Sequence, residues 1–369
     1  MTEAHHQGAV TMVSDITEYC VSPASTIRQV IACIERNSGG TALVVGPEGR
    51  LLDVITDGDV RRAILAGLSL DESISVLRSR RAHSAYPEPV TALIGTEPEE
   101  LLRLMQERAV RQIPLVDESR RVTKLVFLRD LLPDETWPLQ AVVMAGGFGN
   151  RMRPLTEKMP KPMLPVSDKP LLELILQQLR EAGVRRVNVT THYKSEVIAN
   201  HFGDGRNFGV EINYIQEDQP LGTAGALNFV DKSEGPLLIM NGDIITQVDF
   251  RAMVDFHRDN RADMTVGVRL YELSVPYGVM ETEGIDITGI SEKPVLKHFI
   301  NAGIYLLDQS MRRYIPTGQP FDMPDLIKGL IAEGHRVVSF PIHEYWLDIG
   351  HHADYEKALA DAKEGKIAS

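Results

Sequence analysis

A glycine-rich turn directly after a short apolar run is the feature that most limits what this chain can fold into. The run Leu139–Met144 has the length and content of a buried strand. The turn Ala145–Arg151 follows it at once, and Gly146, Gly147 and Gly149 let its backbone approach a ligand with no Cβ in the way. Successive N–H groups in such a turn form a concavity that binds anions. The sequence therefore predicts a phosphate-binding turn at the end of a strand.

Two basic side chains accompany this turn. Arg151 offers a planar fork of donors that suits phosphate oxygens, and Lys161 adds a compact positive charge. A dinucleotide-binding fingerprint would need a third small residue where Met152 stands, and a Walker A loop would need Gly-Lys-Ser or Gly-Lys-Thr after the glycines. Neither pattern is met, which leaves a different kind of phosphate site or a tight turn with surface cations.

The segment resembles the signature of the sugar-1-phosphate nucleotidyltransferases, Gly-Gly-x-Gly-x-Arg-x-x-Pro-Leu-Thr followed by Pro-Lys-Pro. The residues that match are Gly146, Gly147, Gly149, Arg151, Pro154, Leu155, Thr156, Lys161 and Pro162. Asn150 departs from the pattern, since the family usually has Thr before the Arg. The resemblance implies that Ala145 and the three glycines bind the nucleotide, while Arg151 and Lys161 act on the phosphates during catalysis.

Composition narrows the range of partners. The formal net charge of −12 argues against a nucleic-acid surface, which would be basic overall. No apolar run approaches the roughly 20 residues of a membrane span, and the N-terminus lacks a basic-then-apolar signal. Only Cys20 and Cys33 are present, too few for a disulfide framework. We therefore expect a cytoplasmic protein with no nucleic-acid or membrane partner and a flexible tail over residues 1–13.

Residues 14–133 hold two copies of a small unit. In each copy a helical apolar pattern is followed by two short strand-like runs joined by a turn, and then by a second helix. Thr26 opens the first copy and Asp59 lies in its last helix, while Thr96 and Asp130 hold these places in the second. The two spacings are 33 and 34 positions, so the register is nearly kept.

The repeat resembles a tandem pair of CBS domains, at about 14–75 and 80–133, which associate face to face and commonly bind adenine or guanine nucleotides. Thr56 and Asp59 match the family's Thr-x-x-Asp pair, whose Asp holds ribose hydroxyls. Phe127 occupies the Thr position in the second copy, so the resemblance implies at most one competent pocket. A pair that serves only for dimerisation is the alternative.

Residues 139–369 alternate strand-like and helical runs, after a linker predicted at 134–138. This alternation predicts an α/β fold, a Rossmann-like and mostly parallel sheet with helices on both faces, preceded by the α+β CBS module. The expected strands are 139–144, 184–190, 210–216 and 236–240, and the expected helices are 171–179 and 194–202. Ligands bind beyond the carboxyl ends of the strands in such sheets, which is where the motifs fall.

Two aspartates are the candidate metal ligands. Asp243 follows the strand at 236–240, and an Asp at a strand's carboxyl end is well placed to hold Mg²⁺, a hard cation that needs oxygen ligands. Gly-Asp alone is an ordinary turn. The family resemblance implies the partner, Asp348 in Trp346–Gly350, because the two matching aspartates bind the metal together in relatives.

Leu221–Leu227 is a second glycine turn, and it matches the family's base-binding segment with Gly222 as its first glycine. The position five before that glycine contacts the nucleobase in relatives. It is Glu217 here, where enzymes that use uracil or thymine often have Gln. An ionised Glu only accepts hydrogen bonds, and guanine presents N1–H and a 2-amino group to it. We favour GTP over UTP or dTTP; the alternative is that Glu217 points to solvent and the backbone reads the base.

Two further motifs match the family's sugar-binding positions. By resemblance, Glu292 and Asn301 bind sugar hydroxyls, Gly303 lets the sugar approach the backbone, and Lys293 binds the phosphate of the sugar. The catalytic set implied by all the motifs is then Arg151, Lys161, Asp243, Lys293 and Asp348.

The resulting prediction is transfer of a nucleotidyl group from an NTP to a sugar 1-phosphate, with Mg²⁺ as cofactor and pyrophosphate as the second product. A CBS pair joined to this domain looks like guanylyltransferases acting on glucosamine 1-phosphate, with mannose and heptose 1-phosphates as alternatives. A CBS nucleotide sensor with an inactive transferase domain is the rival, although the intact charged set speaks against it. We also expect a homo-oligomer, dimer or tetramer, regulated by an adenine or guanine nucleotide at Thr56 and Asp59.

Overall fold

The computed structural model describes residues 13–81, 88–132 and 139–367. The chain divides into two compact units, Met1–Thr136 and Trp137–Ser369. Residues 1–12 of the predicted tail and the whole predicted linker lie outside the described residues. Within the described ranges, no helix is both long enough and apolar enough to cross a membrane.

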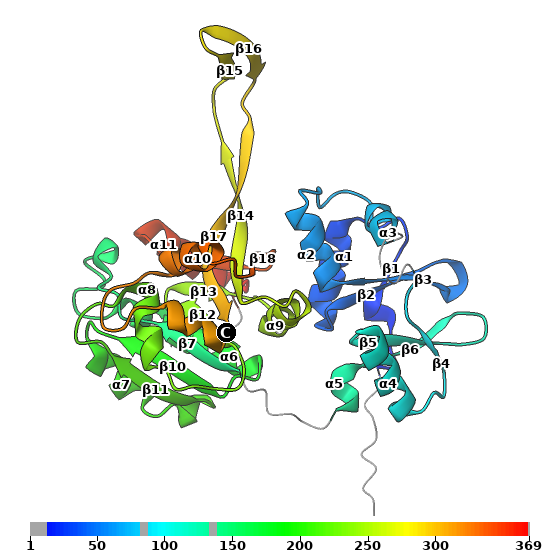
Figure 1. Cartoon of the computed structure of the whole chain (residues 1–369), viewed down its shortest axis with the longest axis horizontal. Helices are drawn as coiled ribbons and strands as arrows, with labels where there is room; N and C mark the ends of the chain where they lie inside the picture. The colour runs from blue at the N-terminus through cyan, green and yellow to red at the C-terminus, as the bar shows by residue number, and fades with distance from the viewer. Residues whose placement is uncertain (1–12, 82–87, 133–138, 368–369) are drawn as a thin grey trace, which may run out of the picture. The chain divides into compact units, whose positions relative to one another are not determined.

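The N-terminal unit contains the predicted repeat (Figure 1). The first copy consists of η1 (Thr17–Tyr19), β1 (Cys20–Val21), α1 (Ile27–Asn37), β2 (Thr41–Val45), η2 (Pro47–Gly49), β3 (Leu51–Thr56) and α2 (Asp57–Leu65), followed by α3 (Ser75–Arg81). The second copy consists of β4 (Ala92–Leu93), α4 (Pro98–Arg108), β5 (Gln112–Val116), β6 (Val122–Phe127) and α5 (Leu128–Leu131). In both three-stranded sheets the first pair of strands is parallel and the second antiparallel, which confirms the repeat.

Reciprocal hydrogen bonds fix where two of these helices begin. At α1 the Thr26 hydroxyl accepts from the Gln29 N–H, and the Gln29 side chain accepts from the Thr26 N–H. Thr56 and Asp59 make the same pair of bonds at α2. Helix α4 begins differently, since Glu97 is its N-cap and Thr96 lies one residue earlier.

The two copies share one buried apolar cluster. Its members are Tyr19, Leu43, Leu51 and Val54 from the first copy and Val116, Val122, Leu125 and Phe127 from the second. Phe127 is 5% exposed, and its ring centre lies 6.0 Å from that of Tyr19. The aromatic side chain that replaces the expected Thr therefore packs the two copies together.

The C-terminal unit is built on a seven-stranded sheet (Figure 1). Its strands are β7 (Gln140–Met144), β10 (Arg186–Thr191), β11 (Glu211–Gln216), β12 (Leu237–Asn241), β14 (Met264–Ser274), β17 (Val295–Leu307) and β18 (Val337–Ile342). The spatial order is β11-β10-β7-β12-β17-β14-β18, and every neighbouring pair is parallel except the two pairs that involve β17. Three small pairs lie outside it: β8 (Pro165–Val166) with β9 (Lys169–Pro170), β13 (Ile244–Thr246) with β19 (Trp346–Asp348), and β15 (Val279–Glu283) with β16 (Asp286–Ser291).

Helices cover both faces of this sheet. One face packs against α6 (Leu171–Glu181), α7 (Ser195–Phe202) and α9 (Phe250–Asp259), and the other against α8 (Gly222–Gly225) and α10 (Met323–Ala332). Along β7, Ala141 and Val143 belong to the first core and Val142 to the second, as the alternation of a strand requires. The remaining elements are α11 (His352–Lys363), η3 (Asn150–Met152), η4 (Lys161–Met163), η5 (Arg206–Phe208), η6 (Ala226–Phe229) and η7 (Gln309–Tyr314). The predicted α/β fold with a mostly parallel sheet is confirmed.

Two features differ from the expected pattern. The strand predicted at 184–190 begins at Arg186, because the Val184 N–H bonds back to the Leu179 carbonyl at the end of α6. Six strands, β14 to β19, lie in a region for which the sequence pattern gave no prediction. Among them, β14 and β17 continue past the sheet as a two-stranded ribbon that ends in β15 and β16 (Figure 1).

Candidate active site

The carboxyl ends of four parallel strands form one edge of the sheet. β7, β10, β11 and β12 run in the same direction, so the residues that follow them meet there. Those residues are the glycine-rich turn after β7, His192 after β10, Glu217 after β11 and Asp243 after β12. β17 runs the opposite way beside β12, which brings Asn301 and Gly303 to the same edge.

The glycine-rich turn presents backbone to open space. It starts at Ala145, whose N–H donates to the Thr190 carbonyl at 3.0 Å. Gly149 has a φ of +63°, in the left-handed region that favours glycine, and its carbonyl accepts from the Thr156 hydroxyl at 2.8 Å. A Cβ on Gly147 would meet nothing within 4 Å. A turn of this form leaves room for phosphate oxygens next to the chain.

Asp243 and Asp348 are neighbours although 105 positions separate them. β13 pairs antiparallel with β19 so that Ile244 lies opposite Asp348, and the Ile349 N–H donates to the Asp243 carbonyl at 2.9 Å. Gly242 permits this close packing, because a Cβ there would lie 2.7 Å from the Met144 carbonyl oxygen. A short accessory ribbon, and not the main sheet, therefore brings the two predicted metal ligands together.

Lys161 and Arg151 flank these two aspartates. Lys161 Nζ lies 2.5 Å from Asp243 Oδ2, and the Lys161 side chain is 10% exposed. Asp243 Oδ1 is buried and has no hydrogen-bond partner within the described part of the chain. Arg151 Nη1 and Asp348 Oδ2 both lie within 4 Å of the place that a Cβ on Gly350 would take. A carboxylate oxygen left without a partner beside a second carboxylate fits a hard divalent cation such as Mg²⁺.

The two carboxylates influence each other electrostatically. Withdrawal from water, and then the nearby Asp243 carboxylate, raise the pKa of Asp348 above its ordinary value of 3.8, while Lys161 and Arg151 act in the opposite direction. The Asp348 residue as a whole is nevertheless exposed, so water screens part of this effect. A cation bound between the two oxygens would remove this repulsion.

Glu217 is buried in the site, with 8% of its surface exposed. Its Oε2 accepts a hydrogen bond from the Leu221 N–H at 3.0 Å, and its Oε1 lies 3.5 Å from the position of a Cβ on Gly146. Burial raises the pKa of Glu217, against the opposing effects of the Leu221 hydrogen bond, of His192 and of a hydrogen bond from the Thr190 side chain. The alternative in which Glu217 points to solvent is therefore wrong.

Gly222 begins the short helix α8 next to Glu217's partner Leu221. Its φ is +75°, and a Cβ there would lie 2.7 Å from both the Phe321 carbonyl oxygen and Asp322 Oδ1. The Ala224 N–H donates to that same carbonyl at 2.9 Å. Only glycine allows this turn to dock so closely on the segment before α10, which fixes the position of Leu221 and hence of the Glu217 carboxylate.

A bulge in β17 positions the predicted sugar-binding residues. Val266 pairs with Tyr305 but Val268 pairs with Asn301, so β17 contains extra residues at this point. Asn301 Oδ1 accepts from the Gly303 N–H at 2.9 Å, and Asn301 Nδ2 donates to the Tyr305 hydroxyl at 2.9 Å. These bonds hold Asn301 and Gly303 at the edge where the other site residues meet.

Asn241 is a site residue that the sequence analysis missed. Its Oδ1 is buried and finds no hydrogen-bond partner in the described ranges, and a Cβ on Gly303 would lie 2.6 Å from its Nδ2. The available signal was a polar residue at the last position of β12, directly before Gly242 and Asp243. A buried amide oxygen without a partner is available to a ligand hydroxyl.

Glu292 and Lys293 do not join the other residues. Both are exposed and lie between β16 and β17. β17 continues from Asn301 to Val295, six positions farther, which corresponds to about 20 Å along an extended strand. Within one chain the structure thus brings together Arg151, Lys161, Asp243 and Asp348, and leaves Lys293 on the ribbon.

Known protein families match both units of the chain. A family model described as nucleotidyl transferase matches residues 140–365, which is more than half of the chain. The chain belongs to the nucleotidyl transferase family. A CBS domain model matches residues 10–66 and 82–133, so this nucleotidyl transferase carries a tandem CBS pair at its N-terminal side.

Three known proteins are similar to this family member. Mannose-1-phosphate guanylyltransferase from Mycobacterium tuberculosis is 35% identical over 240 residues, 62% of this chain and 66% of the relative. D-glycero-alpha-D-manno-heptose 1-phosphate guanylyltransferase from Aneurinibacillus thermoaerophilus is 32% identical over 225 residues, 60% of this chain and 96% of the relative. The structure of a protein assigned as a glucose-1-phosphate thymidylyltransferase from Bacillus anthracis, in complex with sucrose, is 25% identical with a TM-score of 0.50, covering 61% and 96% of the two chains. The chain thus spans slightly less than two thirds of the mycobacterial relative.

The predicted effector residues of the CBS pair already have structural partners. Thr56 Oγ1 donates to Asp59 Oδ2 at 2.8 Å, and Arg62 Nη2 donates to Asp59 Oδ1 at 2.8 Å. Asp59 therefore holds the start of α2 in this structure. A nucleotide that bound Asp59 through its ribose would have to share or replace these bonds.

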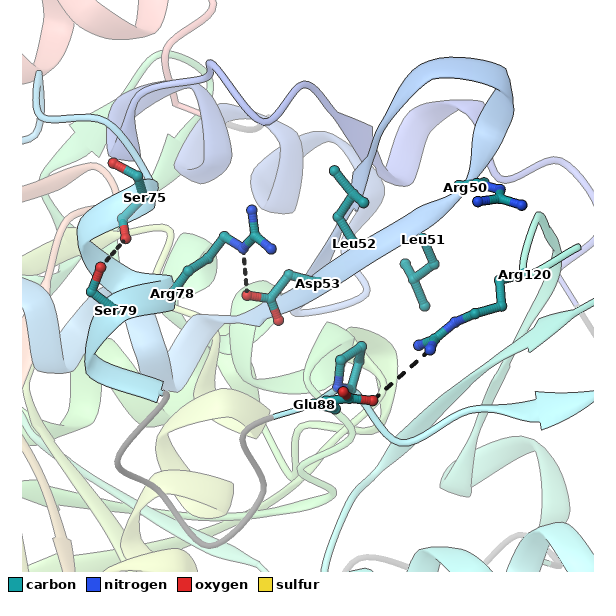
Figure 2. Close-up of a pocket in the computed structure, with 10 residues that line it drawn as sticks. Arg50, Leu51, Leu52, Asp53, Ser75, Arg78, Ser79, Glu88 and Arg120 are labelled. Atoms are coloured by element: carbon teal, nitrogen blue, oxygen red, sulfur yellow. Dashed lines mark hydrogen bonds and ion pairs between the residues drawn. The ribbon is translucent and has the colours of Figure 1, made fainter.

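A cavity of about 700 Å³ lies in the same CBS pair. It is lined by Arg50, Leu51, Leu52, Asp53, Ser75, Arg78, Ser79, Glu88, Pro89 and Arg120, so neither Thr56 nor Asp59 lines it. Figure 2 shows Arg78 directed at Asp53 and Arg120 directed at Glu88, at 3.5 Å and 3.9 Å. This volume suits a small ligand, and guanidinium groups are effective donors to phosphate.

Proposed function

We propose that this chain transfers a nucleotidyl group from a nucleoside triphosphate to a sugar 1-phosphate and releases pyrophosphate. The observation that carries the proposal is the meeting of Asp243, Asp348, Lys161 and Arg151 beside a glycine-rich turn at the carboxyl edge of the sheet. Membership of the nucleotidyl transferase family supports it, as do the names of the relatives that act on mannose and heptose 1-phosphates. The rival function is a nucleotide sensor without transferase activity. Loss of one of these charged groups would favour it, and all four are present.

The proposed chemistry needs positioning and charge stabilisation, and no general base. An oxygen of the sugar phosphate, already ionised, attacks the α-phosphorus of the nucleotide, and the bond from that phosphorus to the pyrophosphate oxygen breaks. Arg151 would bind the departing pyrophosphate, whose charge grows as the bond breaks. Lys161 would reduce the repulsion between the two anionic substrates, and the glycine-rich turn would hold the nucleotide in line for attack.

Asp243 and Asp348 are the residues that would hold a divalent cation, for which we propose Mg²⁺. The unpartnered Asp243 Oδ1 and the raised pKa of Asp348 both support this assignment. Mg²⁺ is commonly held by one or two carboxylates together with substrate phosphates and water, so two protein ligands suffice. When bound, the cation supplies positive charge to the phosphate oxygens.

We propose GTP as the nucleotide, and the buried Glu217 is the reason. Leu221 and the Thr190 side chain hold its carboxylate by hydrogen bonds, and Oε1, which lies beside Gly146, would accept from guanine N1–H and the 2-amino group. UTP and dTTP remain the alternatives. Glu217 disfavours them, because the carbonyl oxygens of their bases would need a hydrogen-bond donor at this position. Mannose, heptose and glucosamine 1-phosphates are the candidate acceptors.

Replacing Glu217 with glutamine is expected to lower kcat/KM for GTP by about 10–100-fold, because a buried donor then faces a donor on the base. The ratio of activity with UTP or dTTP to activity with GTP should rise. Pyrophosphate release measured with each nucleotide gives both the kcat/KM for GTP and this activity ratio. Asp218→Asn, which alters the exposed neighbouring residue, is the matched control and should leave the ratio unchanged. An unchanged preference in Glu217→Gln would contradict the assignment of this residue to the base.

The overall function is tested by pyrophosphate release with Mg²⁺, crossing GTP, UTP, dTTP, CTP and ATP with glucosamine, mannose, heptose and glucose 1-phosphates. Turnover with GTP supports the proposal and identifies the sugar in the same experiment. Turnover with UTP or dTTP alone would keep the reaction and discard the base assignment. Absence of turnover with every pair would favour the sensor.

We further propose that the CBS pair binds a regulatory adenine or guanine nucleotide through Thr56 and Asp59. An added mononucleotide or triphosphate should then change kcat/KM in the wild type and not in Asp59→Ala. Because the Asp59 side chain completes the capping box of α2, that variant should also lose stability, so its unfolding must be followed by circular dichroism. Thr56→Ser keeps the capping hydroxyl and serves as control. A response that survives Asp59→Ala but is lost in Arg78→Ala would place the effector in the 700 Å³ cavity instead.

A further inference from the structure

The ribbon that leaves the C-terminal sheet lacks a core of its own. We call residues 270–300 the arm: it comprises the outer parts of β14 and β17 together with β15 and β16 (Figure 1). β15 and β16 pair with each other and with no other described strand. The exposed large apolar side chains of the arm are Leu270, Tyr271, Leu273, Tyr277, Val279, Met280, Ile285, Ile287, Ile290, Val295, Leu296 and Phe299. A two-stranded ribbon with so much apolar surface is marginal in water unless something covers it.

The inner part of the arm exposes apolar side chains on both faces, and one of these faces also carries an ion pair. Leu273 lies opposite Leu296, and at the tip Met280 lies opposite Ile290, each pair sharing a face. Tyr271 is on the Leu273 face, two residues earlier. The opposite face carries an ion pair, Glu272 with Lys297, at 2.9 Å. Leu270, Phe299 and Val295 share this second face, so apolar surface is exposed on both sides of the arm and the ion pair interrupts it on one of them.

The arm also holds Glu292 and Lys293 away from the site of their own chain. From Val268–Asn301 to Ser274–Val295 the ladder contains seven consecutive residue pairs with no irregularity. The Val275 N–H then bonds to the Pro294 carbonyl at 3.0 Å, directly next to Lys293. A hydrogen-bonded ladder of this length does not fold back on itself without breaking its pairs. The two charged residues are therefore available to a site on another molecule.

The charge and the size of the arm limit which kind of molecule can cover it. It carries five carboxylates and two lysines, which opposes binding to an anionic membrane surface or to nucleic acid. Its 31 residues match the 20–30 residues per side of a standard protein interface. A second copy of the same arm presents the same Leu273 face, as a two-fold symmetric contact requires.

We propose that two copies of this chain exchange arms, so that their Leu273 faces pack together and Glu292 and Lys293 of each copy complete the active site of the other. The packing of the arms stands on the geometry alone. The completion of the site rests on the proposed function, in which Lys293 binds the phosphate of the sugar. Each active site is then formed by two chains.

The packing is tested by sedimentation of the full-length protein at micromolar concentration. The double variant Leu273→Glu/Leu296→Glu should sediment at half the mass of the wild type, with an unchanged circular dichroism spectrum. Glu272→Gln/Lys297→Gln alters the opposite face of the same strands and should keep the wild-type mass. A wild type that is monomeric, or a leucine variant that keeps the wild-type mass, would overturn the proposal.

Site sharing is tested with purified heterodimers carrying two different affinity tags. A heterodimer of Asp243→Asn and Lys293→Ala contains one site with both lesions and one site with neither, so it should show about half the wild-type turnover per dimer. A heterodimer of Asp243→Asn and Asp348→Asn should stay at background. Background activity in the first heterodimer, with active wild type and inactive Lys293→Ala homodimers, would show that the arm serves its own chain. Near-normal activity of Lys293→Ala homodimers would equally refute site sharing. An inactive wild type would contradict the proposed function, and sedimentation would still decide the packing.

Discussion

Asp243→Asn is expected to lower the rate of nucleotidyl transfer by about 10²–10³-fold, the usual effect of removing one electrostatic contact to a transition state. The asparagine keeps the shape of the side chain but loses the charge that holds both the cation and Lys161. The same change should lower the melting temperature. Lys161 is only 10% exposed and lies 2.5 Å from Asp243 Oδ2, so the variant leaves a nearly buried ammonium without its counter-charge.

Pyrophosphate release measures the expected loss of rate, and calorimetry measures the expected fall in melting temperature. Asp168→Asn, an exposed residue in the turn between β8 and β9, is the matched control and should change neither. Near-normal turnover in Asp243→Asn would refute the cation assignment. An unchanged melting temperature would show that Lys161 finds another partner.

Asp348→Asn is expected to abolish activity to a similar degree, about 10²–10³-fold, but to raise the stability of the cation-free protein. The folded-state pKa of Asp348 is raised, first by withdrawal from water and then by Asp243. A carboxyl with a raised folded pKa destabilises the folded state at every pH above that value, because the unfolded chain carries the charge more easily. The neutral asparagine removes this effect.

The pH dependence makes this second prediction specific. The gain in melting temperature of Asp348→Asn over wild type should be full at neutral pH, decline as the pH falls through the raised pKa, and vanish below 3.8, where the wild-type carboxyl is protonated in both states. Calorimetry across this range in the presence of a chelator measures it. A variant that is less stable than wild type at pH 7 would contradict the repulsion between the two aspartates.

Local features of the fold could be predicted from the sequence because their causes are local. Thr26 and Thr56 cap helices through bonds that span three residues, and the apolar run at 139–144 forms a strand whichever strands lie beside it. The mostly parallel sheet followed from alternation alone. The arm could not be predicted in this way. The sequence of one segment does not indicate that β14 and β17 continue past the sheet with no helix packed against them.

The candidate site was predictable only in part, for a related reason. The glycine-rich turn and its cations are contiguous in sequence, whereas Asp243 and Asp348 meet through β13 and β19, and only a family resemblance could pair them. The burial of Glu217 depends on Leu221 and on the docking of α8, which the residue itself does not reveal. Asn241 was overlooked because a polar residue at a strand end is usually solvated. Its unpartnered oxygen became visible only with Gly303 beside it.

The apolar cluster shared by the two CBS copies has a consequence for how such a module is inherited. Leu43 and Val54 from one copy and Leu125 and Phe127 from the other bury each other, so a gene rearrangement that kept a single copy would leave half a core open to water. A lone copy would be prone to unfolding and aggregation. We therefore expect recombination to transfer both CBS copies together, because a single copy would not be stable by itself.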